Sequence, residues 1–377
     1  MTSPTHPFFN TYGQRPLTLV RGEGLRVQDD QGRWYLDACT GIAVLALGHR
    51  HPAVVAAVQA QLDALWHASN LYGVPVQSSF AELLSDTFHG GAVFLCNSGA
   101  EANEAAIKLA RKFWWRQGQP ERVEILTAEH AFHGRTLMGL ALTPKPAYRR
   151  GFGPLPGGVR SLPVADLAAA VSDRTAAVLI EPVQGEGGCR PVSELAAIRA
   201  ACDATGALLI TDEIQCGLGR TGQLHGAVRP DAVTLAKALG GGLPLGALVA
   251  TRPDLHGVFQ PGDHGSTFGG NPVACAAGHA TLRTILDDNL ADNCATQGQR
   301  LRAGLEGLGL RVTGEGLMLA AHLGRPAGPT MAALRDAGVL ACPSGAEGVR
   351  FLPPFTIDSS ATDEVVAAMA VAVEAAG

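Results

Sequence analysis

A lysine stands at the end of an apolar run in this sequence, directly ahead of three glycines. In the segment DAVTLAKALGGG, Lys237 has almost no polar residues near it in sequence. Lys237 is one of only four lysines among 29 basic residues. A free ammonium is costly in apolar surroundings, whereas a neutral amine there is a nucleophile. Lys237 is therefore the first candidate for chemistry, as an amine that bonds to an aldehyde.

A carboxylate and a helix start occupy similar positions in two other segments. In ALLITDEIQ, Asp212 ends an apolar run, where an isolated carboxylate would be costly to bury without a cationic partner. In CNSGAEANEAA, a strand, a turn of small residues and a helix follow one another, so the amides of Gly99 and Ala100 stand at a helix N-terminus. Such an end is a ready anion site, and a phosphate would fit there.

The segment AEHAFHGR adds an aromatic ring and a guanidinium. Phe132 lies beside a turn, and Arg135 offers a fork for a carboxylate. An amine for an aldehyde, an aspartate for a cationic ring nitrogen, an aromatic face for a ring and an anion site for a phosphate are together the needs of pyridoxal 5′-phosphate. Each residue also has a plainer interpretation, as an exposed lysine, a structural cap, a core aromatic residue or a helix start. Their joint occurrence at strand and helix ends favours a cofactor site.

Short apolar runs rich in β-branched residues alternate with helical patterns through the middle of the chain. The runs are AVFLC, VEILT, AAVLIEPV, ALLITDEI, AVTLA and GALVAT. Strands that alternate with helices predict right-handed crossovers and a largely parallel sheet, which makes the fold class α/β. Ligands of such sheets bind at the carboxyl ends of the strands, where Asp212 and Lys237 are expected.

The two ends of the chain show different patterns. Residues 1–50 contain LVRGEGLRVQDDQGRWYLD, whose alternation around DDQGR predicts a hairpin, and residues 283–377 predict a smaller α+β unit against which the hairpin packs. The last helix is expected to have a Ser/Thr cap and to carry Asp363 and Glu364 in its first turn. We therefore expect a large domain over 51–282 and a small domain formed by both terminal segments.

The composition argues against several classes of partner. The 377 residues carry a net charge of −5 and are 46% hydrophobic, without a basic tract for nucleic acid, a polybasic membrane anchor or an apolar run long enough to cross a membrane. Eight dispersed cysteines without a CxxC pair predict reduced thiols, and the opening MTSPTHPFFN does not resemble a signal peptide. We expect a cytoplasmic protein whose ligands are small molecules or proteins.

Two tempting motifs are weak. GLGRTG, at 217–222, spells a dinucleotide-binding pattern, but the QLHGAVRPD that follows shows no helical face and no acidic residue stands at the required distance. An NAD-dependent oxidoreductase and a catalytically silent binding protein are therefore only alternatives, and a glycine-rich active-site loop is the plainer interpretation. The pairs His49-x-His51 and His130-x-x-His133 lack a third ligand at metal-site spacing, so we expect hydrogen-bonding histidines and no metal.

Seven segments in order resemble the motifs of class III, subgroup II, pyridoxal-phosphate aminotransferases, and the likeness spans nearly the whole chain. They are NSGAEANEAAIKLAR, AFHGRT, IEPVQGEGG, LLITDEIQCGLGRTG, LAKALGGGLPLGA, GSTFGGNP and VRFLPP. The resemblance implies the fold-type I architecture, with a mainly parallel seven-stranded sheet in the large domain and a small domain built from both termini. It also implies a homodimer with active sites at the interface.

The resemblance assigns roles at the cofactor. Lys237 resembles the lysine that bonds to the cofactor and then moves the proton between the substrate carbon and the cofactor. Asp212 resembles the partner of the pyridine nitrogen, Phe132 the stacking aromatic residue and Gln215 the residue near the phenolic oxygen. The residues implied at the phosphate are Gly99, Ala100 and, from the neighbouring subunit, Thr267.

The resemblance also assigns roles at the substrate. Arg350 in VRFLPP resembles the arginine that holds the α-carboxylate of glutamate, and Glu186 in QGEGG resembles the glutamate that pairs with it when an ω-amine donor binds. Arg135 would hold the carboxylate at the far end of either substrate, and Ser266 would lie beside the substrate. Such a switch lets one pocket accept both a terminal amine and glutamate.

The segments TGIAVLALGHRHP and WHASNLYGVP resemble the branch of the family that acts on N-acetylornithine, and the small apolar Val44 would leave room for an acyl-amino group. This branch implies reversible ping-pong transfer of an amino group from N-acetylornithine to 2-oxoglutarate, which gives N-acetylglutamate 5-semialdehyde and glutamate in arginine biosynthesis. Succinylornithine, ornithine, 4-aminobutyrate and lysine precursors on a carrier protein are the alternative donors. The chain is slightly short for the family, and the shortening falls in the segment HLGRPAGPTMAALRDAG. We therefore expect the loops of the small domain to differ from those of the family.

Overall fold

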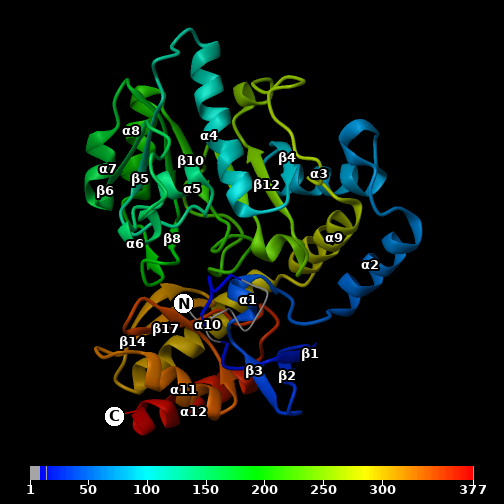
Figure 1. The fold of residues 1–377 in the computed structure, drawn as a ribbon, viewed down its shortest axis with the longest axis vertical. Coiled ribbons are helices and arrows are strands. Elements are labelled where there is room, and N and C mark those ends of the chain that lie inside the picture. The colour runs from blue at the N-terminus through cyan, green and yellow to red at the C-terminus, as the bar shows by residue number, and fades with distance from the viewer. Residues whose placement is uncertain (1–8, 14, 377) are drawn as a thin grey trace.

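A seven-stranded mixed sheet forms the centre of the upper half of the molecule in Figure 1. The structure is a computed structural model that describes residues 9–13 and 15–376. The strand order is β4-β12-β11-β10-β7-β5-β6. The strands are β4 (Ala92–Cys96), β5 (Glu124–Ala128), β6 (Val159–Leu162), β7 (Thr175–Ile180), β10 (Leu208–Asp212), β11 (Ala232–Leu235) and β12 (Gly246–Ala250). Strand β12 runs opposite to the other six and pairs antiparallel with β4 and β11, while all other pairs are parallel, so the predicted, largely parallel sheet is confirmed.

Strand β7 shows why most of the sequence segments that form this sheet are apolar at nearly every position. All six of its residues are buried, because Ala177 and Leu179 face one hydrophobic cluster and Val178 and Ile180 face another. The first cluster lies beneath α4 (Gly99–Arg116) and α5 (Leu137–Leu142), and the second beneath α7 (Val164–Ala170) and α8 (Leu195–Thr205). A parallel sheet covered by helices on both faces needs apolar side chains at every position.

Helix α4 begins immediately after the edge strand β4 and lies across the sheet. The Ser98 side chain caps it by accepting a hydrogen bond from the amide of Glu101 at 3.2 Å. Its buried face carries Ala106, Leu109, Ala110 and Phe113, at the spacing of an amphipathic helix. Three further helices pack together beside β4: α2 (Pro52–Ala64), α3 (Pro75–Thr87) and α9 (Pro272–Asp287).

Two smaller sheets form the lower half of the molecule, where the blue N-terminal strands lie beside the orange and red C-terminal elements (Figure 1). One has the order β1-β2-β3-β15 and the other the order β13-β14-β17-β16. Their elements are β1 (Leu19–Glu23), β2 (Arg26–Asp29), β3 (Trp34–Asp37), β13 (Arg311–Glu315), β14 (Met318–His322), β15 (Val339–Leu340), β16 (Cys342–Ser344) and β17 (Gly348–Phe351). The covering helices are α10 (Leu290–Gly307), α11 (Gly328–Asp336) and α12 (Ser359–Ala376). Because β3 pairs with β15, the expected packing of the N-terminal hairpin on the C-terminal part is confirmed. The domain boundaries at 50 and 282 stay a prediction.

Short elements connect the larger ones. They are α1 (Thr40–Ala43), α6 (Pro146–Arg149), the strands β8 (Val183–Gln184) and β9 (Arg190–Pro191), and the 3-10 helices η1 (Ser69–Leu71), η2 (Lys237–Gly240) and η3 (Pro253–Leu255). None of the helices in the described part of the chain has the length and apolar character of a membrane span.

Two expectations were wrong. The final helix begins at Ser359, so Asp363 and Glu364 lie in its second turn, and it is Asp358 that caps the helix by accepting a hydrogen bond from the amide of Ala361 at 2.8 Å. The cysteines are not all reduced, because Cys39 and Cys342 form a disulfide between the segment after β3 and strand β16. The other six are free and buried.

Candidate active site

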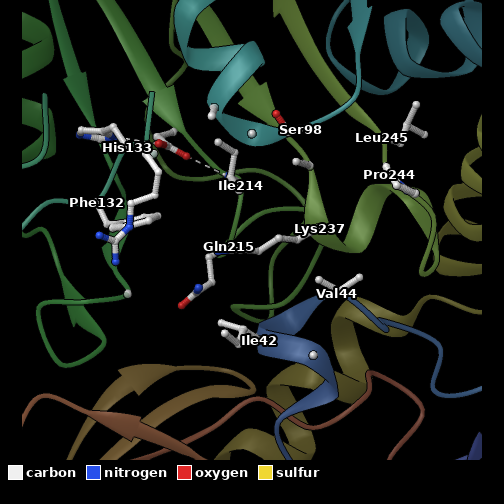
Figure 2. Close-up of a pocket in the computed structure, with 18 of the residues that line it drawn as sticks. Ile42, Val44, Ser98, Phe132, His133, Ile214, Gln215, Lys237, Pro244 and Leu245 are labelled. Carbon is white, nitrogen blue, oxygen red and sulfur yellow. Dashed lines mark hydrogen bonds and ion pairs between the residues drawn. The ribbon is translucent and has the colours of Figure 1, made fainter. Parts of the chain in front are cut away.

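A cavity of about 650 Å³ opens at the carboxyl ends of β10 and β11. It is placed where a ligand of an open α/β sheet is expected. Eight of the predicted site residues line it: Gly99, Ala100, Phe132, Arg135, Glu186, Asp212, Gln215 and Lys237. Figure 2 shows the Lys237 side chain extending toward Gln215, with Ile42 and Val44 on one side of the cavity and Ser98 on the opposite side.

Lys237 is the first residue of η2, directly after β11. Its φ of 46° lies in the left-handed region, a conformation that costs a non-glycine residue about 1–3 kcal/mol and is typical of functional sites. Its Nζ has no hydrogen-bond or ion-pair partner among residues 9–13 and 15–376. Burial lowers the pKa of Lys237 to about 8, against the opposing attraction of Asp212 and Glu181. The amine is therefore close to deprotonation near neutral pH.

Asp212 ends β10 and is buried. Its Oδ2 accepts hydrogen bonds from Asn103 Nδ2 at 2.8 Å and pairs with His133 Nδ1 at 2.7 Å, and its Oδ1 accepts from the amide of Ile214 at 3.1 Å. Three contacts from three different segments fix the orientation of this carboxylate. It can thus present a negative charge to the cavity at a defined position.

Asn103 and His133 are two site residues that sequence reasoning missed as partners of Asp212. The amide oxygen of Asn103 accepts from Thr234 Oγ1 at 2.8 Å, and His133 Nε2 lies 3.0 Å from Thr127 Oγ1. The network therefore joins α4, β5, β10 and β11. An asparagine on the buried face of α4, four residues after its first turn begins, is the signal that could have found it, because buried polar side chains need partners.

The N-terminus of α4 faces the cavity with free donors. The amides of Gly99 and Ala100 donate to no acceptor among the residues that the structure describes. A Cβ at Gly99 would lie 2.6 Å from Ile214 Cδ1, so a larger residue here would have to displace the Ile214 side chain. Free amides and the helix dipole together make this end a site for an anion.

Phe132 and a buried glutamate form another side of the cavity. The amide of Phe132 donates to Glu181 Oε2 at 3.0 Å, and the amide of Gly185 donates to Glu181 Oε1 at 3.2 Å. Burial raises the pKa of Glu181, an effect that the charge of His133 opposes. Glu181 was not singled out from the sequence, where it is one acidic residue at the end of an apolar run.

Arg350, on β17, reaches the same region from the small sheet. Its Nη1 donates to Gly185 O at 3.0 Å and to Gln215 Oε1 at 3.1 Å, while its Nη2 lies 3.9 Å from Glu186 Oε1. Its buried Nε has no partner in the described part of the chain. A buried guanidinium with unused donors is suited to a carboxylate. The predicted pair of Arg350 and Glu186 is therefore adjacent but not in tight contact.

A family model described as "Aminotransferase class-III" matches residues 9–373. The chain belongs to the class-III aminotransferases. This match confirms the expected enzyme class, and with it pyridoxal phosphate as the cofactor of the family.

Individual relatives agree with this family. The chain is 48% identical to an acetylornithine aminotransferase of Streptomyces coelicolor, over 96% of this chain and 92% of the relative. Among solved structures, it resembles an N-acetylornithine aminotransferase of Stenotrophomonas maltophilia with a TM-score of 0.84 and 37% identity, covering 97% of this chain and 98% of that one. It resembles an ornithine aminotransferase of Toxoplasma gondii with a TM-score of 0.93 and 31% identity, covering 97% and 92%. The expected fold class is thereby confirmed.

Three predicted residues of this class-III aminotransferase do not line the cavity: Arg350, which reaches its edge through Gly185, Gln215 and Glu186, and Ser266 and Thr267. Ser266 Oγ accepts a hydrogen bond from Asn97 Nδ2 at 2.9 Å, and Asn97 does line it, so Ser266 lies just behind the wall. Thr267 is exposed and lies outside the cavity of this single chain. That position neither supports nor contradicts the expectation that Thr267 serves the neighbouring subunit.

The segment Thr40–Ala43 closes the cavity from below with an unusual backbone. All four residues have φ between 52° and 66°, which forms a left-handed turn. Such backbone costs non-glycine residues roughly 1–2 kcal/mol each. Asp37 Oδ1 holds the turn by accepting from the amides of Cys39 and Thr40, and Thr40 Oγ1 donates to Leu352 O at 2.7 Å. Val44 follows the turn and lines the cavity, as predicted.

The rejected motifs of this aminotransferase have structural roles. The GLGRTG loop at 217–222 is not followed by a helix and does not line the cavity, so its interpretation as an active-site loop was wrong. Its Gly219 and Gly222 instead pack against α10, where Cβ atoms would meet Ala291 and Ala295 within 3.1 Å. His49 hydrogen-bonds Asp37 at 2.8 Å and His133 hydrogen-bonds Asp212, as expected of hydrogen-bonding histidines.

Proposed function

We propose that this aminotransferase transfers the δ-amino group of N-acetylornithine reversibly to 2-oxoglutarate, forming N-acetylglutamate 5-semialdehyde and glutamate in two half-reactions. The observation that carries the proposal is the unpartnered Lys237 in one cavity with Asp212 and the free amides of α4. Curated acetylornithine aminotransferases that are 42–48% identical to the chain support the choice of donor.

The residues present fit pyridoxal phosphate. The free amides of Gly99 and Ala100 suit its phosphate, Phe132 offers a ring face, Asp212 suits its ring nitrogen and Lys237 suits its aldehyde. When bound, the cofactor supplies an aldehyde that exchanges amino groups and a ring that accepts electrons as a C–H bond of the substrate breaks.

Lys237 and Asp212 carry out the proton chemistry. An amine with a pKa of about 8 is well matched to take a proton from the substrate carbon that bears the amino group and to return it, because the best general base titrates near the working pH. Asp212, held by Asn103 and His133, keeps a proton on the ring nitrogen in place through its negative charge. Ile42 and Val44 add apolar side chains to the wall of the cavity.

Two arginines recognise the substrates, Arg135 on the wall of the cavity and Arg350 next to the cavity residues Gly185 and Gln215. Arg350 holds the α-carboxylate of glutamate with its unused donors, and Arg135 holds the far carboxylate of either substrate. Glu186 neutralises Arg350 when a terminal amine is the donor. The small Val44 leaves space for the acetyl group. Succinylornithine, ornithine, 4-aminobutyrate and carrier-linked lysine precursors are the competing donors.

We also propose a homodimer in the cytoplasm, where amino-acid biosynthesis takes place. Asn70 donates to the carbonyls of Ser266 and Gly269, which ties segment 65–72 to the loop that carries Thr267. Large apolar side chains exposed in this region are Trp66, Leu71, Tyr72 and Phe268. An exposed apolar patch of this kind marks a protein interface, and a second subunit there would receive Thr267 at its phosphate site.

The replacement Lys237→Ala tests the chemistry. Purified wild-type protein loaded with cofactor should show an absorbance band near the edge of the visible range that borohydride removes, and the variant should lack it. Transamination should fall by about 10³-fold because the base is lost. A wild-type protein without such a band would contradict the proposal, whatever the variant does.

A panel of donors tests the substrate. N-acetylornithine, succinylornithine, ornithine and 4-aminobutyrate are each offered with 2-oxoglutarate, and kcat/KM is compared. N-acetylornithine should have the highest value. A higher value for ornithine or 4-aminobutyrate would move the enzyme to another branch of the family without affecting its class.

A further inference from the structure

Glu186 lies between two cations, Lys145 and Arg350, and it is closer to Lys145, which is in none of the seven segments that resemble the family. Its Oε2 lies 3.2 Å from Lys145 Nζ, whereas its Oε1 lies 3.9 Å from Arg350 Nη2. The side chain of Glu186 is 34% exposed, so it is free to turn, while that of Arg350 is 5% exposed and fixed by Gly185 and Gln215. Any exchange of partners must therefore be made by Glu186.

Tyr148 completes the alternative position of Glu186. Lys145 Nζ donates to the Tyr148 hydroxyl at 2.9 Å, and that hydroxyl donates to Glu186 Oε2 at 3.5 Å. On the ring of Tyr148, the Arg135 guanidinium stacks at 3.6 Å from the centroid. The hydroxyl and ammonium thus form a two-donor site for the Glu186 carboxylate, attached to the same tyrosine that supports Arg135.

Charge favours this position over the one against Arg350 whenever a substrate carboxylate binds there. A carboxylate that approaches Arg350 meets the like charge of Glu186 unless Glu186 has moved away. Burial acts to lower the pKa of Lys145, but hydrogen bonds to Tyr148 and Glu186 outweigh it and raise that pKa, so the ammonium keeps its charge across the working range.

We propose that Lys145 is a positioning residue that holds Glu186 away from Arg350 and so sets the balance between the two substrate classes, dicarboxylates and ω-amine donors. The inference rests on the proposed pairing of N-acetylornithine with 2-oxoglutarate. Without Lys145, Glu186 turns to Arg350, which opposes binding of 2-oxoglutarate and glutamate and favours the ω-amine donor.

The test is Lys145→Gln in the cofactor-loaded enzyme, with KM measured separately for the two substrates. The KM for 2-oxoglutarate should rise about fivefold, the upper effect of a partly exposed ion pair, and the KM for N-acetylornithine should fall. Lys145→Arg should restore both values to within about twofold. The control Lys112→Gln removes the same charge from an ion pair with Asp263 away from the cavity and should change neither KM.

A double-mutant cycle with Glu186→Gln isolates the coupling, and the affinity for glutarate, an unreactive dicarboxylate, provides a readout independent of turnover. Lys145→Gln should weaken glutarate binding about fivefold in the wild-type background and have no effect in Glu186→Gln. Equal effects in both backgrounds, or a rise in both KM values together, would overturn the role of Lys145. Failure of wild-type protein to use N-acetylornithine would overturn the proposed donor alone, since glutarate binding would still report on Lys145.

Discussion

Lys237 differs from the other three lysines in having no hydrogen-bond or ion-pair partner at its nitrogen among the residues that the structure describes. The physical consequence is that the pKa of Lys237 is about 8, whereas Lys108 and Lys112 contact the loop at 263–264 and Lys145 contacts Tyr148 and Glu186. With so few lysines, each can be followed separately in one experiment.

The pH dependence of lysine acetylation gives a direct measure of this difference. In protein freed of pyridoxal phosphate, Lys237 is a protonated, unreactive ammonium below pH 8 and a reactive amine above it, so its labelling by acetic anhydride should rise with a midpoint near pH 8. Lys145, whose pKa is raised, should label only at higher pH in the same sample. Peptide mass spectrometry reads both, and equal profiles would contradict the effect of burial on Lys237.

Individual site residues were predictable to different degrees. Lys237 and Asp212 were predictable because a charged side chain at the end of an apolar strand is costly to bury without a partner. Asn103 and His133 did not, because their significance lies in partners that are distant in the sequence and meet only once α4 lies across β10. Lys145 was not predicted for the same reason, since no pattern in TPKPAYRR indicates that its side chain contacts Glu186.

At the scale of elements, the strands buried on both faces were the most predictable. The six apolar runs correspond to β4, β5, β7, β10, β11 and β12. Strand β6 was not predicted, because its sequence VRSL is short and half polar, as suits the last strand of a sheet. The start of α12 was misplaced because Asp358 and the serines after it are all plausible caps, and the hydrogen bond from Ala361 decides between them.

The N-terminus of α4 offers a test of the anion site as a whole. In Gly99→Ala the new methyl group must displace Ile214, whose nearest atom would lie 2.6 Å away. We expect about a tenfold loss of affinity for pyridoxal phosphate, measured by absorbance titration, because the amide of this residue moves with the helix end.

Two further variants interpret that result. Combining Gly99→Ala with Ile214→Val removes the nearest clashing atom and should recover part of the affinity. Gly307→Ala, at a helical glycine with open space around it, should leave the affinity unchanged. A Gly99→Ala protein with wild-type affinity would show that α4 tolerates a side chain at its first residue and that the close approach to Ile214 is unimportant.

At the scale of the whole molecule, the disulfide was the least predictable feature. Cys39 and Cys342 are 303 residues apart and belong to no spacing motif, and only the pairing of β3 with β15 brings their Cα atoms to 5.5 Å. Dispersed cysteines without a short-range pattern favour reduced thiols. Spacing alone therefore could not predict a disulfide between cysteines that only the tertiary fold brings together. The link joins the left-handed turn below the cavity to the strand beside Arg350.

The disulfide predicts a specific response to reductant. Non-reducing alkylation of unfolded protein should label six cysteines and leave one cross-linked pair of peptides. Dithiothreitol should lower the free energy of unfolding by about 2–4 kcal/mol. The variant Cys342→Ser should lose that sensitivity, whereas Cys275→Ala, which removes a free buried thiol, should keep it. Eight labelled cysteines in the unreduced protein would contradict the pairing.

The pairing of β3 with β15 also has a consequence for folding during synthesis. A ribosome completes β1, β2 and β3 long before β15, so the hairpin spends most of synthesis with the hydrogen-bonding edge of β3 unsatisfied. An unpaired strand edge can form hydrogen bonds with a strand of another chain. Multidomain proteins are therefore most prone to aggregate while such edges are unpaired. The floor of the catalytic cavity, which directly follows β3, is thus made early in synthesis, whereas β15, the strand that completes its sheet, is made late.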